Sequence, residues 1–557
     1  MKNLRSSTLN LFLSVFFVTG YCQTEIFDGV EFEMPKVIEP EFLNYSVSIL
    51  DFGAVADGLT LNTEAFKEAI DHVALKGGGR VVVPRGVWLT GPIVLKSNIN
   101  LHTEAGALVL FSTNKELYPL IHSYYEGRED VRCQSPISGR DIENIAFTGK
   151  GIFDGNGQVW RHVKREKLTP NQWKDLINSG GVTNANETVW YTSQGQMKAY
   201  QLRDKGELIN YTSIEDCRPM RDFFRPVMIS LINCKNILFD GPTFQNSPNW
   251  NIHPLMCENL TVRNTSIRNP WFSQNGDGID IESSKNVLVY DNNFDVGDDA
   301  ICIKSGKDKS GRERGIPSEN IIIKNNIVYS GHGGVVVGSE MSGGVRNVHI
   351  SDCTFIGTEA GIRFKSRRGR GGVVEKIYIT NIDMIDVLTN AISFNLYYQG
   401  KSMVEMIADN DHEKVQKIVV PVTEKTPIFR DISIKNINCK GAFQAIYVRG
   451  LPEMKIEDLH LENLNMTADN GLTCIDVSDL TIIDLKLNAI NPRAAQFFNV
   501  EKATIKGLNL INQPDGAIVV GGSESNNIEI ELTESKKNQN ILTVQDDLMS
   551  NEIVLKH

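Results

Sequence analysis

Three aspartates in two short glycine-containing segments have the residue type that acid–base hydrolysis requires. Asp277 lies in NGDGID, and Asp298 and Asp299 form the pair in GDDAICIKSG. Carboxyl groups held close together raise the pKa of at least one of them, because ionising the last one works against its neighbours. One carboxyl can then stay protonated as a general acid while another activates water, as in glycoside hydrolysis. An isolated Asp-Asp pair is more often a turn or a calcium ligand, so the hypothesis requires that these residues meet in space.

A repeated unit supplies the elements that would bring them together. The unit opens with Asn, Lys or Asp and continues as an alternating apolar strand that closes in polar and Gly residues. The openings are Asn144, Asn236, Asn259, Asn286, Asn320, Asn347, Lys376, Asp431, Lys455, Asp479, Lys502 and Asn527. Undisturbed steps are 23 to 25 residues long, and longer steps imply loops inserted at corners.

Such a strand cannot bury its apolar face alone, whereas stacked coils form a continuous core. The period therefore predicts an all-β fold, a single-stranded right-handed parallel β-helix, which is a solenoid. A leucine-rich horseshoe has a similar period but needs regularly placed Leu, and these strands are rich in Ile and Val. The segment from Asn62 to Lys76 has helix-forming residues, with Gly77 at its stop, and is expected to cap the open N-terminal end.

Counting from the openings indicates which polar residues share one side of the stack, because similar offsets land on the same face. Five successive coils contribute Trp250, His253, Asp277, Asp298, Asp299, His332, Arg363 and Lys365. Neighbouring strands are roughly 4.8 Å apart, so five coils make a strip of about 20 Å, the length of a few sugar rings. A lateral offset would give the roughly 6.5–9.5 Å between carboxyls that suits an inverting enzyme, and the shorter retaining distance stays open.

Some members of this strip also have structural interpretations. Trp250 and His253 are equally well explained as packing residues. Asp280 follows Asp277 by three residues, and alternation after Gly278 turns it elsewhere, so we expect a mainly structural role.

Basic residues crowd the same strip, although the 557-residue chain has a net charge of −11. Arg363 and Lys365 are spaced by one residue in a strand-like segment and should point the same way. Arg binds carboxylates through two parallel hydrogen bonds, so an anionic sugar is the natural ligand. Among the remaining cations, those in 307–314 and 367–370 are interpreted as solvated loop charges. The acidic balance argues against a nucleic-acid partner.

The chain organisation follows from its ends and its interruptions. Lys2 and Arg5 precede an apolar run, Leu9–Val18, which predicts a signal peptide over 1–22, cleaved near Cys22, and a secreted or periplasmic protein. An N-terminal extension over 23–46 and a β-helix domain over 47–557 follow, with an excursion at about 158–225. No later run approaches a spanning helix, so no membrane span is expected.

Composition also bounds the cofactors and partners. Eight cysteines follow Cys22, spread thinly and without a CxxC pair, so neither a disulfide framework nor a zinc site is expected. Most should be small buried core residues. We expect no cofactor, no metal and a monomeric protein.

The segments SPNWNIHP, NGDGID, GDDAICIKSG, GHG and RFK together resemble the polygalacturonase family of glycoside hydrolases, family 28. DFGAVADG and GGGRVVVPRGVWLTGP near the N-terminus are also similar to segments of this pectin-degrading superfamily. The resemblance implies a right-handed parallel β-helix and metal-free hydrolysis with inversion. It further implies that Asp298 is the general acid and that Asp277 and Asp299 activate water.

The resemblance also implies the binding residues. His332 would tune the acid or contact the sugar, and Arg363 and Lys365 would bind the galacturonate carboxylate. Tyr398 is the candidate for an expected substrate-contacting tyrosine, with Tyr397 close behind. The remaining substrate-binding candidates are Asn275, Trp250 and His253. The sequence departs from the family pattern at Gly276, which replaces Thr, and at Phe364, which stands between Arg and Lys.

The leading functional prediction is a secreted hydrolase of α-1,4-galacturonosyl bonds in pectic polysaccharide or oligogalacturonide. We expect it to act from chain ends, because the excursions at 158–225 and 304–317 can wall off one end of a cleft. Three alternatives are a hydrolase of rhamnogalacturonan or another decorated pectin, a calcium-dependent lyase, and a non-catalytic carbohydrate-binding β-helix. Binding alone does not need the carboxylate cluster, which disfavours the last of these.

Overall fold

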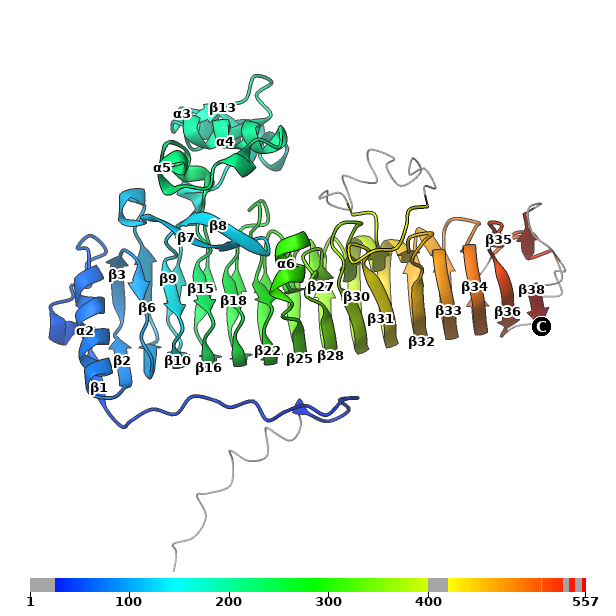
Figure 1. The fold of residues 1–557 in the computed structure, drawn as a ribbon, viewed down its shortest axis with the longest axis horizontal. Coiled ribbons are helices and arrows are strands. Elements are labelled where there is room, and N and C mark those ends of the chain that lie inside the picture. The colour runs from blue at the N-terminus through cyan, green and yellow to red at the C-terminus, as the bar shows by residue number, and fades with distance from the viewer. Residues whose placement is uncertain (1–25, 399–418, 512, 534–539, 546–552, 557) are drawn as a thin grey trace, which may run out of the picture.

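The computed structural model describes residues 26–398, 419–511, 513–533, 540–545 and 553–556. In these residues the chain winds into a right-handed parallel β-helix whose coils stack along one axis (Figure 1). Hydrogen bonds join 33 strands into one system, and the predicted fold is confirmed. The predicted signal peptide lies outside the described residues.

Three faces run along the stack, and most coils give one short strand to each. Sheet 1 consists of β4 (Ile93–Val94), β9 (Ile137–Arg140), β15 (Ile229–Ile232), β18 (Ile252–Leu255), β21 (Ile279–Glu282), β24 (Asp299–Lys304), β27 (Gly333–Gly338) and β29 (Ile362–Lys365). Sheet 2 consists of β1 (Ser46–Ser48), β2 (Gly79–Val83), β5 (Ile99–Thr103), β10 (Glu143–Gly149), β16 (Lys235–Asp240), β19 (Glu258–Arg263), β22 (Lys285–Tyr290), β25 (Ser318–Lys324) and the start of β28 (Val345–Ile356). Sheet 3 consists of β3 (Gly86–Thr90), β6 (Ala107–Phe111), β11 (Ile152–Asp154), β17 (Thr243–Gln245), β20 (Ser266–Arg268), β23 (Asn293–Asp295), β26 (Ile327–Ser330) and the end of β28.

In the C-terminal half, single long strands bend around the corners. These are β30 (Val373–Asn395), β31 (Ile428–Arg449), β32 (Ile456–Ala468), β33 (Asn470–Ala489) and β34 (Ala495–Leu510), followed by β35 (Ile518–Gly521), β36 (Asn526–Leu532), β37 (Leu542–Val544) and β38 (Ile553–Lys556).

The core is a column of apolar side chains stacked coil over coil. Because the strands pair in register, like residues lie above one another: Phe147 stacks on Phe239 with ring centroids 4.7 Å apart. Phe364, the departure noted in the sequence, likewise stacks on Phe394 at 4.3 Å. Its ring belongs to this core, which explains an aromatic residue between Arg363 and Lys365.

A ladder of asparagines forms one edge of the stack. Seven successive asparagines have a left-handed backbone, and each amide nitrogen from Asn144 onward donates to the amide oxygen one coil earlier. They are Asn98, Asn144, Asn236, Asn259, Asn286, Asn320 and Asn347, with separations of 2.9–3.4 Å. Asn tolerates this conformation better than most residues because its short side chain bonds locally. The recurring sequence openings are therefore the left-handed corners.

One predicted opening is wrong. The left-handed corner of its coil is Asp458, with φ 50°, rather than Lys455. Lys455 instead forms ion pairs with Glu501 and Glu524. A short bridge between Leu451 and Met454 lengthens the preceding turn and shifts the corner by three residues.

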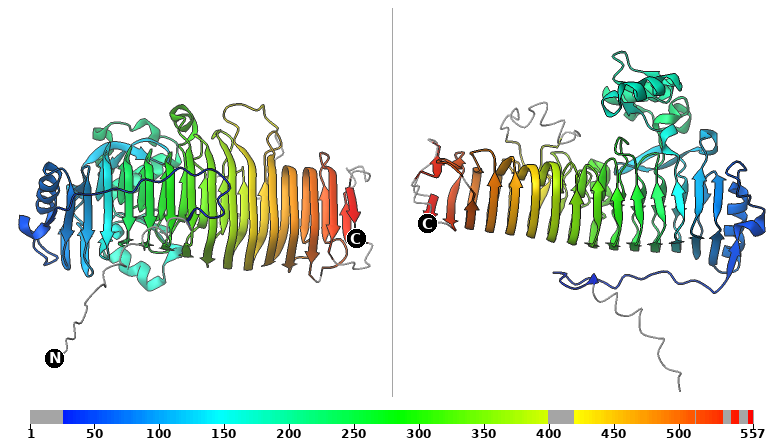
Figure 2. Two further views of the ribbon diagram at one scale, coloured as in Figure 1. Left: turned by 90° about the horizontal axis from the view of Figure 1, so that it is seen from below. Right: turned by 180° about the vertical axis from the view of Figure 1, so that it is seen from behind.

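The N-terminal end of the stack is closed as expected. After η1 (Ile49–Phe52), helix α2 (Thr63–Leu75) covers the first coil and buries Phe66, Ile70 and Val73. The capping helix is therefore confirmed. Residues 26–46 run back along the outside of sheet 2 as an extended strap (Figures 1 and 2), with Val37 packed against Leu288 and Ile322.

Two excursions rise on the same side of the stack (Figure 1). The first is a hairpin of β7 (Leu120–Tyr125) and β8 (Arg128–Cys133), preceded by η2 (Lys115–Leu117), which the sequence analysis did not anticipate. The second, here called the insertion, contains η3 (Gly157–Val159), β12 (Val163–Lys164), η4 (Arg165–Lys167), α3 (Pro170–Asn178), β13 (Val182–Thr183), β14 (Val189–Tyr191), α4 (Gln194–Asp204), η5 (Leu208–Asn210), α5 (Ile214–Cys217) and η6 (Arg218–Phe223). A short helix, α6 (Asp308–Arg314), packs against β8.

All eight cysteines of the described residues are buried and unpaired, as the sequence suggested. In the described part of the chain, none of the helices has both the length and the apolar character needed to cross a membrane.

The ladder gives a stability prediction. Asn259 is 6% exposed, donates to Asn236 and accepts from Asn286. Asn259→Ala should lower the free energy of unfolding by about 1–3 kcal/mol, because two buried amide groups lose their partner. Urea unfolding followed by circular dichroism measures this change. Asn259→Gly keeps the left-handed backbone without strain, so a glycine variant as stable as the native protein would show that the ladder bonds contribute nothing.

Candidate active site

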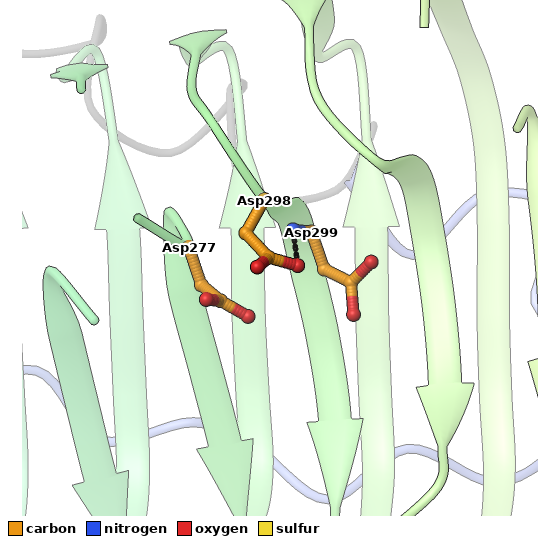
Figure 3. A group of neighbouring side chains, drawn as sticks. All are labelled: Asp277, Asp298 and Asp299. Atoms are coloured by element: carbon orange, nitrogen blue, oxygen red, sulfur yellow. Dashed lines mark hydrogen bonds between the residues drawn. The ribbon is translucent and has the colours of Figure 1, made fainter. Parts of the chain in front are cut away.

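The three aspartates meet where the strands of sheet 1 begin. The carbonyl oxygen of Asp277 accepts from Asn251 N–H, and that of Asp299 accepts from Gly278 N–H, so Asp277 and Asp299 occupy the same position in adjacent coils. One carboxylate oxygen from each aspartate lies within 4.8 Å of the others (Figure 3). In-register stacking accounts for this closeness, because it leaves only the interstrand spacing between Asp277 and Asp299; the expected gap of 6.5–9.5 Å between the acid and base carboxyl groups stays a prediction.

Main-chain groups orient the third aspartate. The N–H groups of Asn275 and Asp299 donate to the two carboxylate oxygens of Asp298, at 3.2 and 3.1 Å. Asn275 has a left-handed backbone, and a Cβ on Gly276 would lie 1.9 Å from Ser273 Oγ. The turn therefore requires glycine at the position where the family pattern has Thr.

Two cationic side chains balance the acids. Lys365 Nζ lies 2.6 Å from Asp299 Oδ2, and both side chains are buried. His332 Nδ1 lies 3.1 Å from Asp298 Oδ1, and its Nε2 lies 3.7 Å from Glu359 Oε2. The structure thus brings together the predicted Asp277, Asp298, Asp299, His332 and Lys365, whereas sequence reasoning did not identify Glu359.

Burial and charge distribute the protons unevenly. Burial, followed by the charges of Asp298 and Asp280, raises the pKa of Asp277 well above its ordinary value. Burial also acts on Asp298, but the charge and hydrogen bond of His332 prevail and lower its pKa. Against the effect of burial, Asp298 raises the pKa of His332 to about 9. At neutral pH the free site therefore holds a proton on His332, with Asp298 ionised, and of the carboxyls Asp277 and Asp298 it is Asp277 whose protonation the surroundings favour.

Asp280 lies beneath the cluster in a buried charge network. Lys304 Nζ is 3.3 Å from Asp280 Oδ1 and 3.3 Å from Glu340 Oε2. Burial raises the pKa of Asp280 to about 8, in spite of the lysine. The side chain is fully buried, in keeping with the structural role expected from the sequence.

The predicted carboxylate-binding residues gather beside the acids. Arg363 is 3% exposed, and its Nη2 has no hydrogen-bond partner among the described residues. The ring centroid of Tyr398 lies 5.7 Å from the Arg363 guanidinium and 5.2 Å from Lys365 Nζ. Tyr397 points elsewhere, its ring held between Arg368 and Arg449. Tyr398 is thus the tyrosine that shares this pocket.

Trp250 and His253 do not line an open cleft. The hairpin places Tyr125 against Trp250, with ring centroids 4.7 Å apart, and Trp250 is 2% exposed. His253 is 1% exposed and its Nε2 lies 2.9 Å from Glu282 Oε2. The prediction that these two residues bind substrate is corrected to packing, because Tyr125 of the unanticipated hairpin packs on Trp250, and His253 is buried against Trp250 and Glu282.

A cavity of about 680 Å³ lies between the hairpin, the insertion and the acidic coils. Tyr125 and Arg132 line it from the hairpin, and Arg203 from the insertion. Asn275 lines it from the catalytic turn, where Arg225 Nη2 donates to Asn275 Oδ1 at 3.1 Å. Arg225 was not identified from the sequence, because only the folded insertion brings it beside this turn.

Three carboxylates at this spacing are close enough together to bind one metal ion. The donor set does not fit one well, because Lys365 and His332 already occupy and neutralise Asp299 and Asp298. We therefore do not assign these aspartates as metal ligands.

Comparison with known proteins identifies the family. Residues 221–479 match the family described as Glycosyl hydrolases family 28. A protein of Vitis vinifera named "Probable polygalacturonase" is 32% identical over 452 residues, which cover 78% of each chain. The chain belongs to glycoside hydrolase family 28. It is therefore a glycoside hydrolase, as the motifs predicted.

Two further relatives of this family 28 protein extend the comparison. The "Exo-poly-alpha-D-galacturonosidase" of Dickeya chrysanthemi is 28% identical over 83% of this chain and 74% of its own. The crystal structure of a hyperthermoactive exopolygalacturonase from Thermotoga maritima is 33% identical, with a TM-score of 0.64. That alignment covers 80% of this chain and 90% of the Thermotoga chain.

The raised pKa of Asp277 gives a prediction about how stability depends on pH. The folded-state pKa exceeds the unfolded value of about 3.9, so burial of this group costs free energy once pH rises above that value. Asp277→Asn should therefore raise the free energy of unfolding at pH 7, and the gain should vanish as pH falls below about 4.

Denaturant unfolding between pH 3 and 8 measures the gain. Asp295→Asn, at an exposed position on β23, is the matched control and should show no such trend. A gain that is constant across this range would contradict the electrostatic explanation.

Proposed function

We propose that this family 28 enzyme is a polygalacturonase that hydrolyses α-1,4-galacturonosyl bonds, acting from chain ends with inversion. The observation that carries the proposal is the carboxylate cluster, flanked by buried cations on the neighbouring strand. The names of the Vitis, Dickeya and Thermotoga relatives support the same substrate class.

The cations account for an acidic sugar. Arg363 has an unpartnered buried nitrogen beside Lys365 and Tyr398, next to the acids that would cleave the bond. A guanidinium binds a carboxylate through two hydrogen bonds, and a neutral sugar would offer this buried nitrogen no charged partner. A galacturonate carboxylate supplies the missing partner.

In the proposed reaction, water attacks the anomeric carbon as the glycosidic C–O bond breaks. Asp299, held by Lys365, accepts a proton from the water, and Asp277 completes the binding site of that water. The bonding electrons pass to the leaving oxygen, which takes a proton from Asp298. Because Asp298 is ionised in the free site, that proton must reach it from His332 when substrate replaces solvent.

Action from chain ends is supported by the cavity beside the acids. The hairpin and the insertion enclose it, and Asn275, whose N–H holds Asp298, lies in its wall. Its volume of about 680 Å³ is that of a small-ligand pocket. In this proposal a chain end occupies the cavity beside the turn that holds Asp298.

We further propose export through the signal peptide over residues 1–22. The support is Lys2 and Arg5 ahead of the apolar run Leu9–Val18. Sequencing the N-terminus of protein recovered from outside the cytoplasm tests this proposal, and a retained Met1 would contradict it.

Product analysis tests the proposed activity. Polygalacturonate should release one short product from the outset, first seen as the β-anomer by proton NMR, because inversion at an α-linkage gives that anomer. Chelator should have no effect, and no ultraviolet-absorbing unsaturated product should form.

Each other outcome would contradict one part of the proposed activity. An early ladder of oligomers would contradict action from chain ends, and an α-anomer would contradict inversion. Absorbance that requires calcium would indicate a lyase. Turnover only of rhamnogalacturonan would overturn the substrate assignment.

Removing the proposed acid gives a second test. Asp298→Asn should lower kcat roughly 10²–10⁴-fold, because the leaving oxygen loses its proton donor. Initial rates of reducing-sugar release measure the loss, with Asp295→Asn as the control. Undiminished turnover in a folded Asp298→Asn protein would refute the assignment.

A further inference from the structure

His332 stands between two carboxylates that belong to different coils. Asp298 Oδ1 lies 3.1 Å from Nδ1, and Glu359 Oε2 lies 3.7 Å from Nε2. A neutral imidazole carries a proton on only one of its nitrogens, so two carboxylate acceptors are satisfied together only by the imidazolium. The raised pKa of His332, about 9, agrees with this geometry.

Glu359 is held firmly in place. Its N–H donates to Gly331 O at 2.8 Å, and its carbonyl oxygen accepts from Thr389 N–H and Oγ1–H at 2.8 and 2.6 Å. Ala360 N–H donates to His332 O at 3.2 Å. The loop that carries Glu359 is thus fastened directly to the turn that carries His332, and the side chain is 8% exposed.

We propose that Glu359 is a positioning residue whose carboxylate retains the Nε2 proton of His332, so that the Nδ1 proton is the one passed to Asp298. This inference rests on the proposed function. As the glycosidic C–O bond breaks, its electrons pass to the leaving oxygen, which takes the Asp298 proton. That proton is the Nδ1 proton of His332, which Asp298 receives before it passes it on, so Asp298 ends ionised and His332 is left neutral with its proton on Nε2.

Without Glu359, no carboxylate would face Nε2 and favour the tautomer of neutral His332 that carries its proton there. The ring would also be free to turn away from Asp298, since only one carboxylate would orient it. At 3.7 Å from Nε2, Glu359 is an ion-pair partner rather than a hydrogen-bonded one. A charged or polar partner on the far nitrogen is a general means of fixing the tautomer and orientation of histidine.

The charged groups that act on this relay come from two neighbouring coils. They are Asp298 just before β24, Asp299 at the start of β24, Glu359 from the loop before β29, and Arg363 and Lys365 from β29. Removing the charge of Glu359 while leaving the others in place should destabilise the imidazolium.

The test compares Glu359→Gln with Glu359→Asp, which keeps the charge, and with Glu319→Gln. Glu319 lies on β25, outside the site, and forms an ion pair with Arg346 on β28. Glu359→Gln should lower kcat about 10- to 100-fold. Its KM should stay within about twofold of the native value, because substrate binding is not removed. The alkaline limb of its pH–rate profile should move to lower pH, and Glu359→Asp should restore part of both changes.

A second measurement does not depend on the substrate. NMR of ¹³C-labelled histidine, with His332 assigned by its loss in His332→Gln, should show a lower His332 pKa in Glu359→Gln and no change in Glu319→Gln. Unchanged His332 titration, or a pH–rate profile that superimposes on the native one, would overturn the inference. Native protein that fails to cleave polygalacturonate would refute the proposed function instead, and the NMR titration would still decide the role of Glu359.

Discussion

The stacking of parallel coils in register is the constraint on which the rest of this structure depends. Each strand pairs with the equivalent strand one coil away, so residues at the same coil position lie about one interstrand spacing apart. In the core this produces stacked Phe rings, and at the corners it produces the asparagine ladder. Where the strands β21 and β24 of sheet 1 begin, it places Asp277 beside Asp299. The same geometry that stabilises the fold therefore concentrates negative charge at one point.

The negative charge of these clustered carboxylates has to be compensated by cations inside the protein. Lys365 and His332 do so from the next coils, and both contacts are short enough to be hydrogen bonds as well as ion pairs. Within the described residues Asp277 has no ion pair of this kind, and its pKa is the one raised. The cluster thus combines the Lys365–Asp299 ion pair, an ionised Asp298 beside an imidazolium, and an acid whose pKa is raised, all produced by position along a single regular stack. A stability cost at such a site is a common accompaniment of activity.

Much of this arrangement could be predicted from the sequence, since it depends on regular repetition. The fold, the capping helix and the approach of Asp277, Asp298, Asp299, His332 and Lys365 follow from strand openings and their spacing. Features that depend on irregular segments could not be predicted. The hairpin over Trp250 and His253 has no repeat signal, and the position of Arg225 depends on how the insertion folds.

Small irregularities had similar effects. The corner at Asp458 was displaced by a local bridge that no periodicity reports. Glu359 was overlooked because it lies in the loop before β29, where a single Glu has no pattern to distinguish it.

The strap formed by residues 26–46 has a consequence for how the molecule comes apart. Coils of a solenoid touch only their neighbours, so such stacks ordinarily fray from an end, one layer at a time. Here the chain ahead of the first layer reaches across the outside to pair Glu31 with His349 and Glu39 with Arg263. The N-terminal coils are thereby linked to coils hundreds of residues further along the chain. For the N-terminal end, blue in Figure 1, to unfold first and separate from the stack, these contacts with the middle coils must break.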